Sequence, residues 1–350
     1  MSKRADQLLT NAAGRAIRGA GRVGRDAAGL AFGAAGLALS APISLTRRLV
    51  PRISGGERRP PGSAPGIDQI DQRAAEADAP HITIQWTSYE DDQLDERDVA
   101  FDELEAMLGK LAQAARTADG PVQWVTVRGL NAYLIGRFRE ALNLHTLAAE
   151  DALVVPQLPK VESFTEHLFV VARLVTTTQT GLHAEQVSIF LLGRCVLVFQ
   201  ESDADPFDAI RQRLRVGISR FRGGGPGYLL YALLDGIVDH GYPVLEQISD
   251  RLEALEGPVL EEPTPETLRA VHTLKRELTL FRRIIWPTRQ MLETLRRDEA
   301  DVLDESARTF LRDVHDHAAQ LLSIVEAQRE VAGGLADLYL SSVSNRMNEA

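Results

Sequence analysis

Acidic residues at short spacing are the side chains of this sequence that could hold a metal ion. Glu150 and Asp151 are adjacent, and they follow a stretch with helical periodicity. Asp235 and Asp239 stand one helical turn apart in LLDGIVDH. Carboxylates without Lys or Arg partners repel one another and raise one another's pKa values, unless a cation neutralises them. Such oxygen ligands suit Mg²⁺, Ca²⁺ or Mn²⁺ better than zinc. From spacing alone, a solvated acidic face is the simpler interpretation of each pair.

A third acidic group is mixed with histidines in the segment FLRDVHDHAAQ, which contains Asp313 and Asp316. Asp313 and His317 are four residues apart, so on a helix they share one face and could chelate a transition metal. The intervening His315 points elsewhere. Two ligands do not complete a metal site, and a surface position for His317 accounts for the spacing equally well.

The segment LADLYLSSVSNRMNEA carries a polar stripe on a predicted helix. The stripe consists of Asp337, Leu340, Ser341, Ser344 and Asn348. Their spacing places them on one helical face. The stripe is too polar for a coiled-coil seam and too uncharged for an ordinary surface. In a symmetric oligomer it would form stacked rings of oxygen-bearing side chains, as in cation pathways. An exposed helix face is the alternative.

The elements that position these residues begin with an expected mixed-sheet α/β/α domain over residues 81–222. HITIQWTSY and VQWVTVRGL alternate like strands, and HLFVVARLVTTT, QVSIFLLG and CVLVFQE are further strand-like runs. Gly193-Arg194 joins the last two runs as a hairpin. The apolar spacing in 98–118 and 131–144 predicts two helices, which makes the expected fold class α+β.

Long helices are expected from residue 223 onward. Residues 223–305 predict paired antiparallel helices, with a bend at Gly241–Pro243 and a kink at Pro287. Residues 306–350 predict one stalk helix, interrupted only by Gly333-Gly334, which would span about 67 Å at about 1.5 Å per residue. A helix of that length needs partners, most simply copies of itself in an oligomer.

Composition excludes several classes of protein. The chain has 350 residues, of which 44% are hydrophobic, so it can bury a large core. A single cysteine, Cys195, excludes a disulfide framework and a Cys-based zinc site. No Gly-x-Ser-x-Gly or His-Glu-x-x-His motif is present, and FRGGGPG lacks the Lys-Ser/Thr of a P-loop. The sequence therefore offers no argument for an enzyme.

Charge separates residues 1–80 from the rest. Residues 1–60 carry 11 Lys/Arg against 3 Asp/Glu, whereas the remaining residues carry 28 against 46. An acidic body disfavours nucleic acid and suits cations. Residues 27–46 are uncharged, but Gly, Ala and Ser dominate them, so they support a transmembrane helix only weakly. A disordered basic tail and Pro/Gly linker over 1–80, an interfacial helix on anionic lipid and a signal sequence are the three interpretations.

Several motifs together resemble the CorA family of magnesium transporters. They are PKVESF at 159–164, EQVSIFLL, CVLVFQE, GYLLYALLD, LKREL…RRIIWPTRQ, RDVHDH and YLSSVSNRMNE, in order between about His81 and Ala350. The YLSSVSN…NE run is the most specific, because it matches the start of that family's pore-lining helix. The resemblance implies a homopentameric funnel at the cytoplasmic face of the inner membrane. It also implies transport of Mg²⁺ or Co²⁺ rather than enzymatic activity.

The resemblance also implies roles for four acidic residues. Glu150 and Asp151 match an acidic pair at the subunit interface, opposite Asp313 of the partner subunit. Asp235 matches a position near a second interfacial metal. Bound Mg²⁺ would bridge these carboxylates, sense intracellular magnesium and hold the pentamer closed.

Three further residues match positions that face the pore axis of that family. They are Asp337, Leu340 and Asn348. Because Mg²⁺ gives up its water reluctantly, a ring of Asn348 amides could select the hydrated ion through hydrogen bonds to that water.

Members of that family continue into two hydrophobic helices joined by a Gly-Met-Asn loop, and these are absent from the 350 residues. We therefore expect the chain to be the cytoplasmic part of a transporter, attached to the membrane through the segment after Ala350. The zinc-transporting branch of the same superfamily is one alternative, which His317 keeps open. A standalone soluble metal sensor or scaffold, whose basic tail binds membrane, is the other.

Overall fold

The structure is a computed structural model that describes residues 52–53, 72–179, 181–217, 219–297 and 303–349. Nearly all of the basic tail and most of the expected linker lie outside the described residues. Within the stretch expected to be linker, residues 52–53 form strand β1 and residues 72–78 form helix α3.

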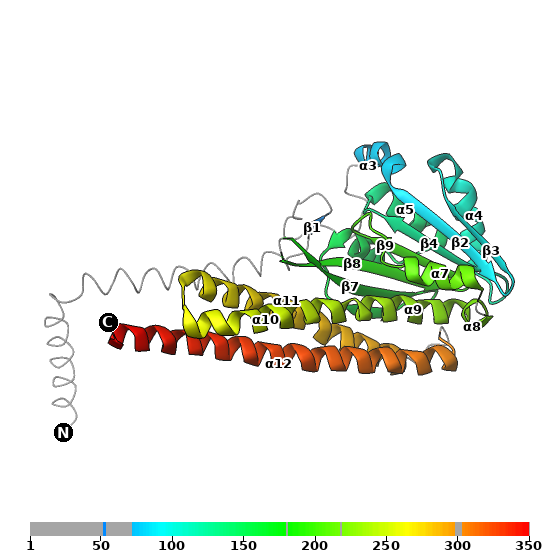
Figure 1. Ribbon diagram of the computed structural model, residues 1–350. Helices are drawn as coiled ribbons and strands as arrows, with labels where there is room; N and C mark the ends of the chain where they lie inside the picture. Colours follow the sequence, from blue (N-terminus) through cyan, green and yellow to red (C-terminus); the bar gives the residue numbers. More distant parts are fainter. Residues whose placement is uncertain (1–51, 54–71, 180, 218, 298–302, 350) are drawn as a thin grey trace, which may run out of the picture. The chain divides into compact units, whose positions relative to one another are not determined.

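A seven-stranded mixed sheet lies at the centre of the N-terminal half (Figure 1). Its order is β3-β2-β4-β9-β8-β7-β6, and in this sheet only β4 and β9 pair in parallel. Its strands are β2 Thr83–Glu90, β3 Gln93–Asp98, β4 Val122–Arg128, β6 Lys160–Ser163, β7 Leu168–Thr178, β8 Gly181–Leu192 and β9 Cys195–Gln200. The predicted hairpin is confirmed, because β8 and β9 pair antiparallel across Gly193-Arg194. A separate two-stranded sheet joins β1 to β5, Val154–Val155.

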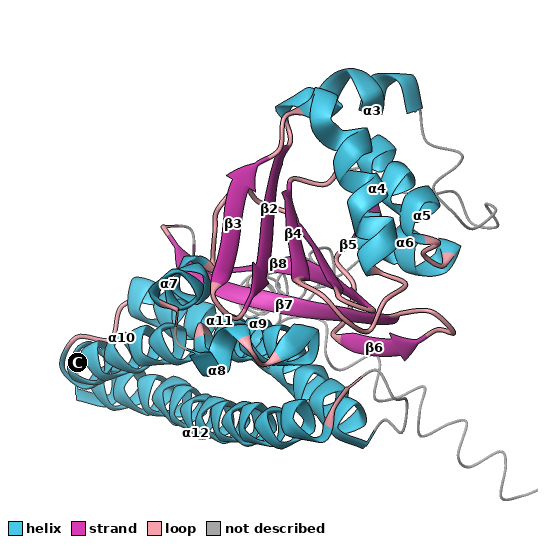
Figure 2. Ribbon diagram, turned by 90° about the vertical axis from the view of Figure 1, so that its right-hand side faces the viewer, coloured by secondary structure: helices cyan, strands magenta, loops and turns pink. Residues whose placement is uncertain are grey.

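Helices cover both faces of the large sheet (Figure 2). One face packs against α4 (Leu104–Ala114), α5 (Ala132–Leu142) and α6 (Thr146–Leu153). The other face packs against α7 (Asp208–Val216), α9 (Gly225–Asp239) and the long helices that follow. Because helices lie on both sides, every residue of β9 is buried, and the strand reads as a continuous apolar run rather than an alternating one.

The first strands and helices differ in detail from their predicted bounds. The predicted helix 98–118 begins later, since residues 93–98 form edge strand β3 and a 3-10 turn precedes α4. The predicted helix 131–144 is α5, which ends where Asn143 turns left-handed at φ 53°. Beyond it lies α6, which places Glu150 and Asp151 inside a helix rather than after one.

The C-terminal half consists of long helices. They are α9, α10 (Gly241–Glu261), α11 (Pro265–Arg297) and α12 (Glu305–Glu349), preceded by the short α8 (Ser219–Arg222). The predicted bend is the break between α9 and α10. A Cβ on Gly241 would lie 2.9 Å from Leu321 and Phe281, so only glycine lets the three helices approach there. Helix α11 continues through Pro287.

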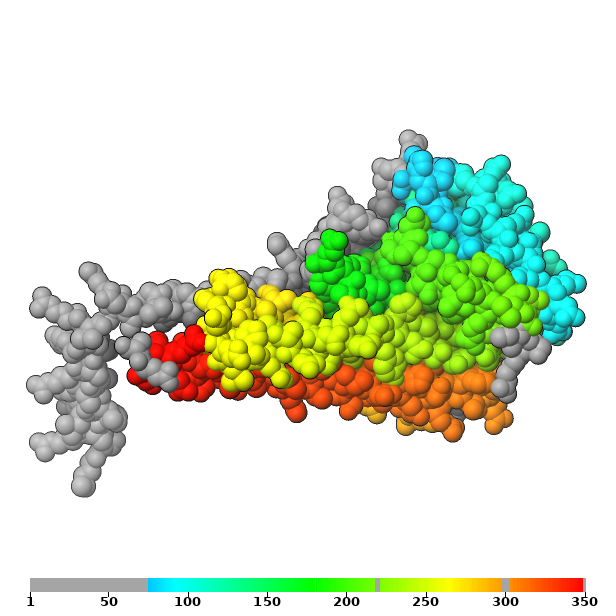
Figure 3. Space-filling view, viewed as in Figure 1, coloured from blue at the N-terminus to red at the C-terminus, as the bar shows by residue number. Residues whose placement is uncertain are grey.

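Helix α12 runs alongside α10 and α11, as Figures 1 and 3 show. Its buried residues recur every three or four positions from Ala307 to Tyr339, which is the period of a helix packed along one seam. Beyond Tyr339 no residue of the described helix is buried. The prediction of one helix over 306–350 is confirmed.

None of the described helices combines the length and the apolar composition that a membrane crossing needs. The predicted domain bounds of 1–80, 81–222, 223–305 and 306–350 stay predictions.

Candidate divalent-metal centre

Helices α9 and α12 bring four of the acidic and histidine side chains together. Asp235 and Asp239 lie one turn apart near the end of α9, and Asp313 and His317 lie one turn apart on α12. These four residues are called the α9–α12 cluster below. Each i, i+4 pair faces the other helix because both helices bury the apolar side chains that flank the pairs.

The imidazole of His317 lies at the centre of the cluster. Its Nδ1 atom is 3.7 Å from Asp235 Oδ1 and 3.5 Å from Asp239 Oδ1, and its Nε2 atom is 3.8 Å from Asp313 Oδ2. One ligand atom from each of Asp235, Asp239 and His317 lies within 4.8 Å of the others. Nδ1 is buried and has no hydrogen-bond partner among the described residues. The spacing therefore leaves room for a cation between the side chains.

Negative charge accumulates in this cluster. Burial, followed by the carboxylates of Asp239 and Asp313, raises the pKa of Asp235 to about 6, although His317 and Arg213 act in the opposite direction. Burial and the nearby Asp235 carboxylate also raise the pKa of Tyr231 to about 12. Among the described residues, no Lys or Arg forms an ion pair with a carboxylate of the cluster. A bound cation would therefore relieve electrostatic repulsion that the chain itself does not neutralise.

The donor set of the cluster fits a divalent cation. Three carboxylates offer the hard oxygen ligands that Mg²⁺ prefers, with water completing its coordination. The imidazole adds a ligand that suits Co²⁺, Ni²⁺ or Zn²⁺. The cluster can therefore bind a hard divalent ion through oxygen, or a transition metal with His317 as an additional ligand.

The acidic pair Glu150 and Asp151 lies elsewhere, on α6. Asp151 is not free of cationic partners, because Lys160 Nζ lies 2.5 Å from its Oδ2 atom. Its backbone carbonyl accepts a hydrogen bond of 2.7 Å from Gln186 Nε2. Glu150 is half-buried. The structure thus does not place this pair in the α9–α12 cluster of the same chain, and its predicted position opposite a partner subunit stays a prediction.

The polar stripe lies on the outward-facing side of the last turns of α12, where Arg346 still donates to the backbone carbonyl oxygen of Glu261 at the end of α10. All five of its residues are exposed, and Leu340 is exposed by 63%. An exposed leucine among polar side chains has no packing partner in a single chain.

Spacing in the sequence made candidates of all four residues, as the separate pairs Asp235 with Asp239 and Asp313 with His317, and the family resemblance selected only Asp235 and Asp313. Their signal was the i, i+4 spacing within each helix. That spacing fixes which residues share a face, but it does not show that the faces of α9 and α12 meet.

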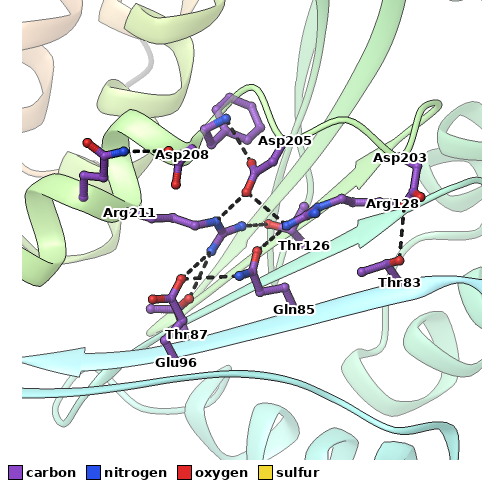
Figure 4. Close-up of polar contacts among 12 residues, drawn as sticks. Thr83, Gln85, Thr87, Glu96, Thr126, Arg128, Asp203, Asp205, Asp208 and Arg211 are labelled. Carbon is purple, nitrogen blue, oxygen red and sulfur yellow. Dashed lines mark hydrogen bonds and ion pairs between the residues drawn. The ribbon is translucent and has the colours of Figure 1, made fainter.

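A second polar cluster, beneath α7, is built differently (Figure 4). Here Arg211 is buried, and its Nε atom lies 3.1 Å from Asp205 Oδ2. Its other nitrogens donate to Thr87 Oγ1 at 3.1 Å and to Thr126 Oγ1 at 3.0 Å. The guanidinium carbon also stacks 3.9 Å from the centroid of a Trp124 ring.

The carboxylates of this second cluster are shared between arginines. Asp205 also pairs with Arg128 at 3.0 Å, and Glu96 pairs with Arg215 at 2.7 Å while lying 3.9 Å from Arg211. These five charged residues are called the Arg211 cluster below. Its carboxylates already have cationic partners, which leaves little reason for a metal to bind.

Comparisons with known proteins agree with the fold. The family model of the CorA-like Mg²⁺ transporter proteins matches residues 119–350. The cobalt/magnesium transport protein CorA of Thermotoga maritima is 41% identical over 229 residues, which are 65% of this chain and 65% of that protein. The matched part thus spans slightly less than two thirds of that relative.

Solved structures of low sequence identity share the architecture. The complete CorA magnesium transporter of Methanocaldococcus jannaschii matches with a TM-score of 0.62 at 16% identity, over 76% of this chain and 78% of that chain. The ZntB cytoplasmic domain of Vibrio parahaemolyticus matches with a TM-score of 0.57 at 14% identity, over 77% of this chain and 99% of that one. The predicted fold class is confirmed.

Proposed function

The chain belongs to the family of CorA-like Mg²⁺ transporter proteins, whose family model matches residues 119–350, and on this premise we propose that it is the cation-sensing part of a divalent-cation transporter. The observation that carries the proposal is the α9–α12 cluster, where three carboxylates surround an imidazole and none of them pairs with a described Lys or Arg. Transport and sensing make and break no covalent bond, so we assign no catalytic residue.

Electrostatic repulsion between the carboxylates of the cluster is what allows a bound cation to change the arrangement of the subunits. Two carboxylates about 4 Å apart repel each other by roughly 4 kcal/mol at an effective dielectric constant near 20. Mg²⁺ or Co²⁺ between them turns that repulsion into attraction. In our proposal one ion is bound by Asp313 and, across a subunit boundary, by Glu150 and Asp151, and a second ion is bound near Asp235. Ion occupancy then decides between two arrangements of the subunits.

The proposed assembly is a homopentamer at the cytoplasmic face of the inner membrane. In it the exposed stripe of α12 faces the fivefold axis, so that Asp337, Leu340 and Asn348 line the cation pathway. Support comes from the exposure of all three residues in the single chain, since a pore-lining residue must contact neither its own core nor lipid.

The proposal is tested by melting and sedimentation of the purified chain in 10 mM Mg²⁺ and in chelator. A ligand present at 100 times its Kd stabilises by about 2.7 kcal/mol, so Mg²⁺ should raise the melting temperature by roughly 5 °C. It should also increase the oligomeric fraction. The double variant Asp151→Asn, Asp313→Asn should lose both responses.

The matched control is Asp316→Asn, because Asp316 is exposed on the same helix but belongs to neither acidic site. It should respond to Mg²⁺ like the wild type. An unchanged Mg²⁺ response in the double variant would show that the assigned site is wrong.

The zinc-transporting branch is a second candidate, favoured by the unpaired Nδ1 atom of His317, which faces two carboxylates. Calorimetry with Zn²⁺ and with Mg²⁺ separates the two candidates. If Zn²⁺ is the natural ion, His317→Ala should weaken Zn²⁺ binding at least tenfold, while Mg²⁺ binding changes little. Equal effects on both ions would remove the reason for this candidate.

A further inference from the structure

Lys160 lies between two carboxylates that belong to different elements. Its Nζ atom is 2.5 Å from Asp151 Oδ2 on α6 and 2.8 Å from Glu162 Oε1 on β6. The same atom lies 5.8 Å from the centroid of the Phe169 ring. The side chain remains 30% exposed. Lys160 is therefore close to the surface and bridges two anionic partners at the same time.

The backbones on both sides of this contact are held in place, so the lysine side chain is the part that can move. Strand β6 pairs with β7, with Lys160 opposite Val171. Gln186 fixes the α6 side by its hydrogen bond to the Asp151 carbonyl oxygen. Lys160 and Glu162 are two residues apart on the strand and so project from the same face. The ammonium group needs only side-chain rotation to leave Asp151 while it keeps its contact with Glu162.

We propose that Lys160 is a built-in competitor of the divalent cation at Asp151, and that this competition sets the cation concentration at which the protein responds. In the cation-free chain the ammonium group neutralises Asp151. When a divalent cation binds Asp151, the ammonium group leaves that carboxylate and keeps only Glu162. This inference rests on the proposed function, because it takes Asp151 as a ligand of the sensed ion.

The nature of the pair makes such an exchange feasible. A lysine offers three rotatable donors on a flexible stem, whereas an arginine holds its partners through a planar, two-pronged contact. Ion pairs that remain partly exposed are worth up to about 1 kcal/mol, so a divalent ion can displace this one. Removing the competitor should lower the Mg²⁺ midpoint by roughly three- to fivefold.

The test measures the Mg²⁺ midpoint of thermal stabilisation for the full chain and its variants. Lys160→Met should lower the midpoint by roughly three- to fivefold and, without Mg²⁺, should lower the melting temperature, because Asp151 loses its counter-ion. Lys160→Gln should do the same and provides a polar second variant. Glu162→Gln should raise the midpoint, because the displaced lysine loses its remaining partner.

Two controls separate local competition from a general change in charge. Lys110→Met removes the same charge from an exposed position over the Trp86 ring, and it should leave the midpoint within twofold of the wild type. In an Asp151→Asn background, Lys160→Met should no longer shift the midpoint. A purely structural role for Lys160 would lower the melting temperature equally with and without Mg²⁺.

The outcomes are distinguishable. If the wild type responds to Mg²⁺ and Lys160→Met and Lys160→Gln keep its midpoint, the competition is overturned while the proposed function stands. If Lys160→Met still shifts the midpoint without the Asp151 carboxylate, the competition is overturned as well. If the wild type shows no response to Mg²⁺, the proposed function fails, and the inference fails with it.

Discussion

The Arg211 cluster and the α9–α12 cluster both gather carboxylates around one nitrogen-bearing side chain, but they differ in how the negative charge is neutralised. The Arg211 side chain is 1% exposed and donates to two hydroxyls while pairing with Asp205. The His317 side chain is 33% exposed, and its contacts of 3.5–3.8 Å to three carboxylates are too long for strong hydrogen bonds.

This difference indicates different uses of charge. Where α7 packs on the sheet, the chain supplies permanently charged guanidinium groups. Where α9 meets α12, three carboxylates share one imidazole, and none of them pairs with a described Lys or Arg. The Lys160–Asp151 pair is intermediate, because its cation belongs to the chain but is a single, partly exposed lysine shared by two carboxylates.

The largest effect is expected from Arg211→Met. Removing the guanidinium leaves Asp205 and Glu96 without one of their buried partners, and breaking such a pair costs about 3–5 kcal/mol. Urea unfolding at pH 7.5 should show that loss. Arg215→Met is the matched control: its side chain is 47% exposed, so it should cost at most about 1 kcal/mol. Equal losses would show that burial does not distinguish the two arginines.

A second prediction concerns His167, which is buried and has no hydrogen-bond partner for either ring nitrogen among the described residues. Burial lowers its pKa from 6.5 to about 4. Its contribution to stability is therefore complete above pH 6.5 and declines as the pH falls towards 4, by up to about 3 kcal/mol. His167→Phe should remove this acid sensitivity in urea unfolding measured from pH 7 to pH 4.5.

The third prediction concerns Asp235, which should make the fold more stable, not less, as the pH falls, and the expected change in stability is smaller. The raised pKa of Asp235 means that its charged form destabilises the metal-free fold above about pH 6, and protonation relieves this as the pH falls towards 3.8. In chelator at pH 7.5, Asp235→Asn should therefore raise the free energy of unfolding by about 2 kcal/mol. A loss of stability in chelator would mean that the chain neutralises this carboxylate after all, and the contrast with the Arg211 cluster would disappear.

The sequence predicted the apolar strands and the longest helix well, because burial on both faces leaves a simple pattern. The end of β8 (IFLL, 189–192) and most of β9 (CVLVF, 195–199) are apolar runs on either side of Gly193-Arg194, and α12 repeats its buried positions over most of 45 residues. Strand β3 was missed because QLDERD is an exposed edge strand, where charge is tolerated and discourages pairing with other chains.

The candidate site was only partly predictable, for a physical reason. Spacing of four residues shows that Asp235 with Asp239, and Asp313 with His317, share helix faces. Whether two such faces meet depends on packing between helices that are far apart in the sequence. The same holds for Arg211, whose hydroxyl partner Thr87 is 124 residues away. Lys160 lies only nine residues from Asp151, but its side chain reaches that carboxylate because β6 passes beside α6.

Helix α12 is unbroken, so a small change in its tilt at one end becomes a larger displacement of residues at the other end. His317 lies near its packed end and Asn348 near its exposed end, separated by about 46 Å at about 1.5 Å per residue. A tilt of about 5° around His317 would carry Asn348 sideways by about 4 Å, which exceeds the radius of a water molecule. Because buried residues from Ala318 to Tyr339 pack α12 along α10 and α11, those helices must move with α12 in such a tilt, and only the turns after Tyr339, where no described residue is buried, are free to swing alone.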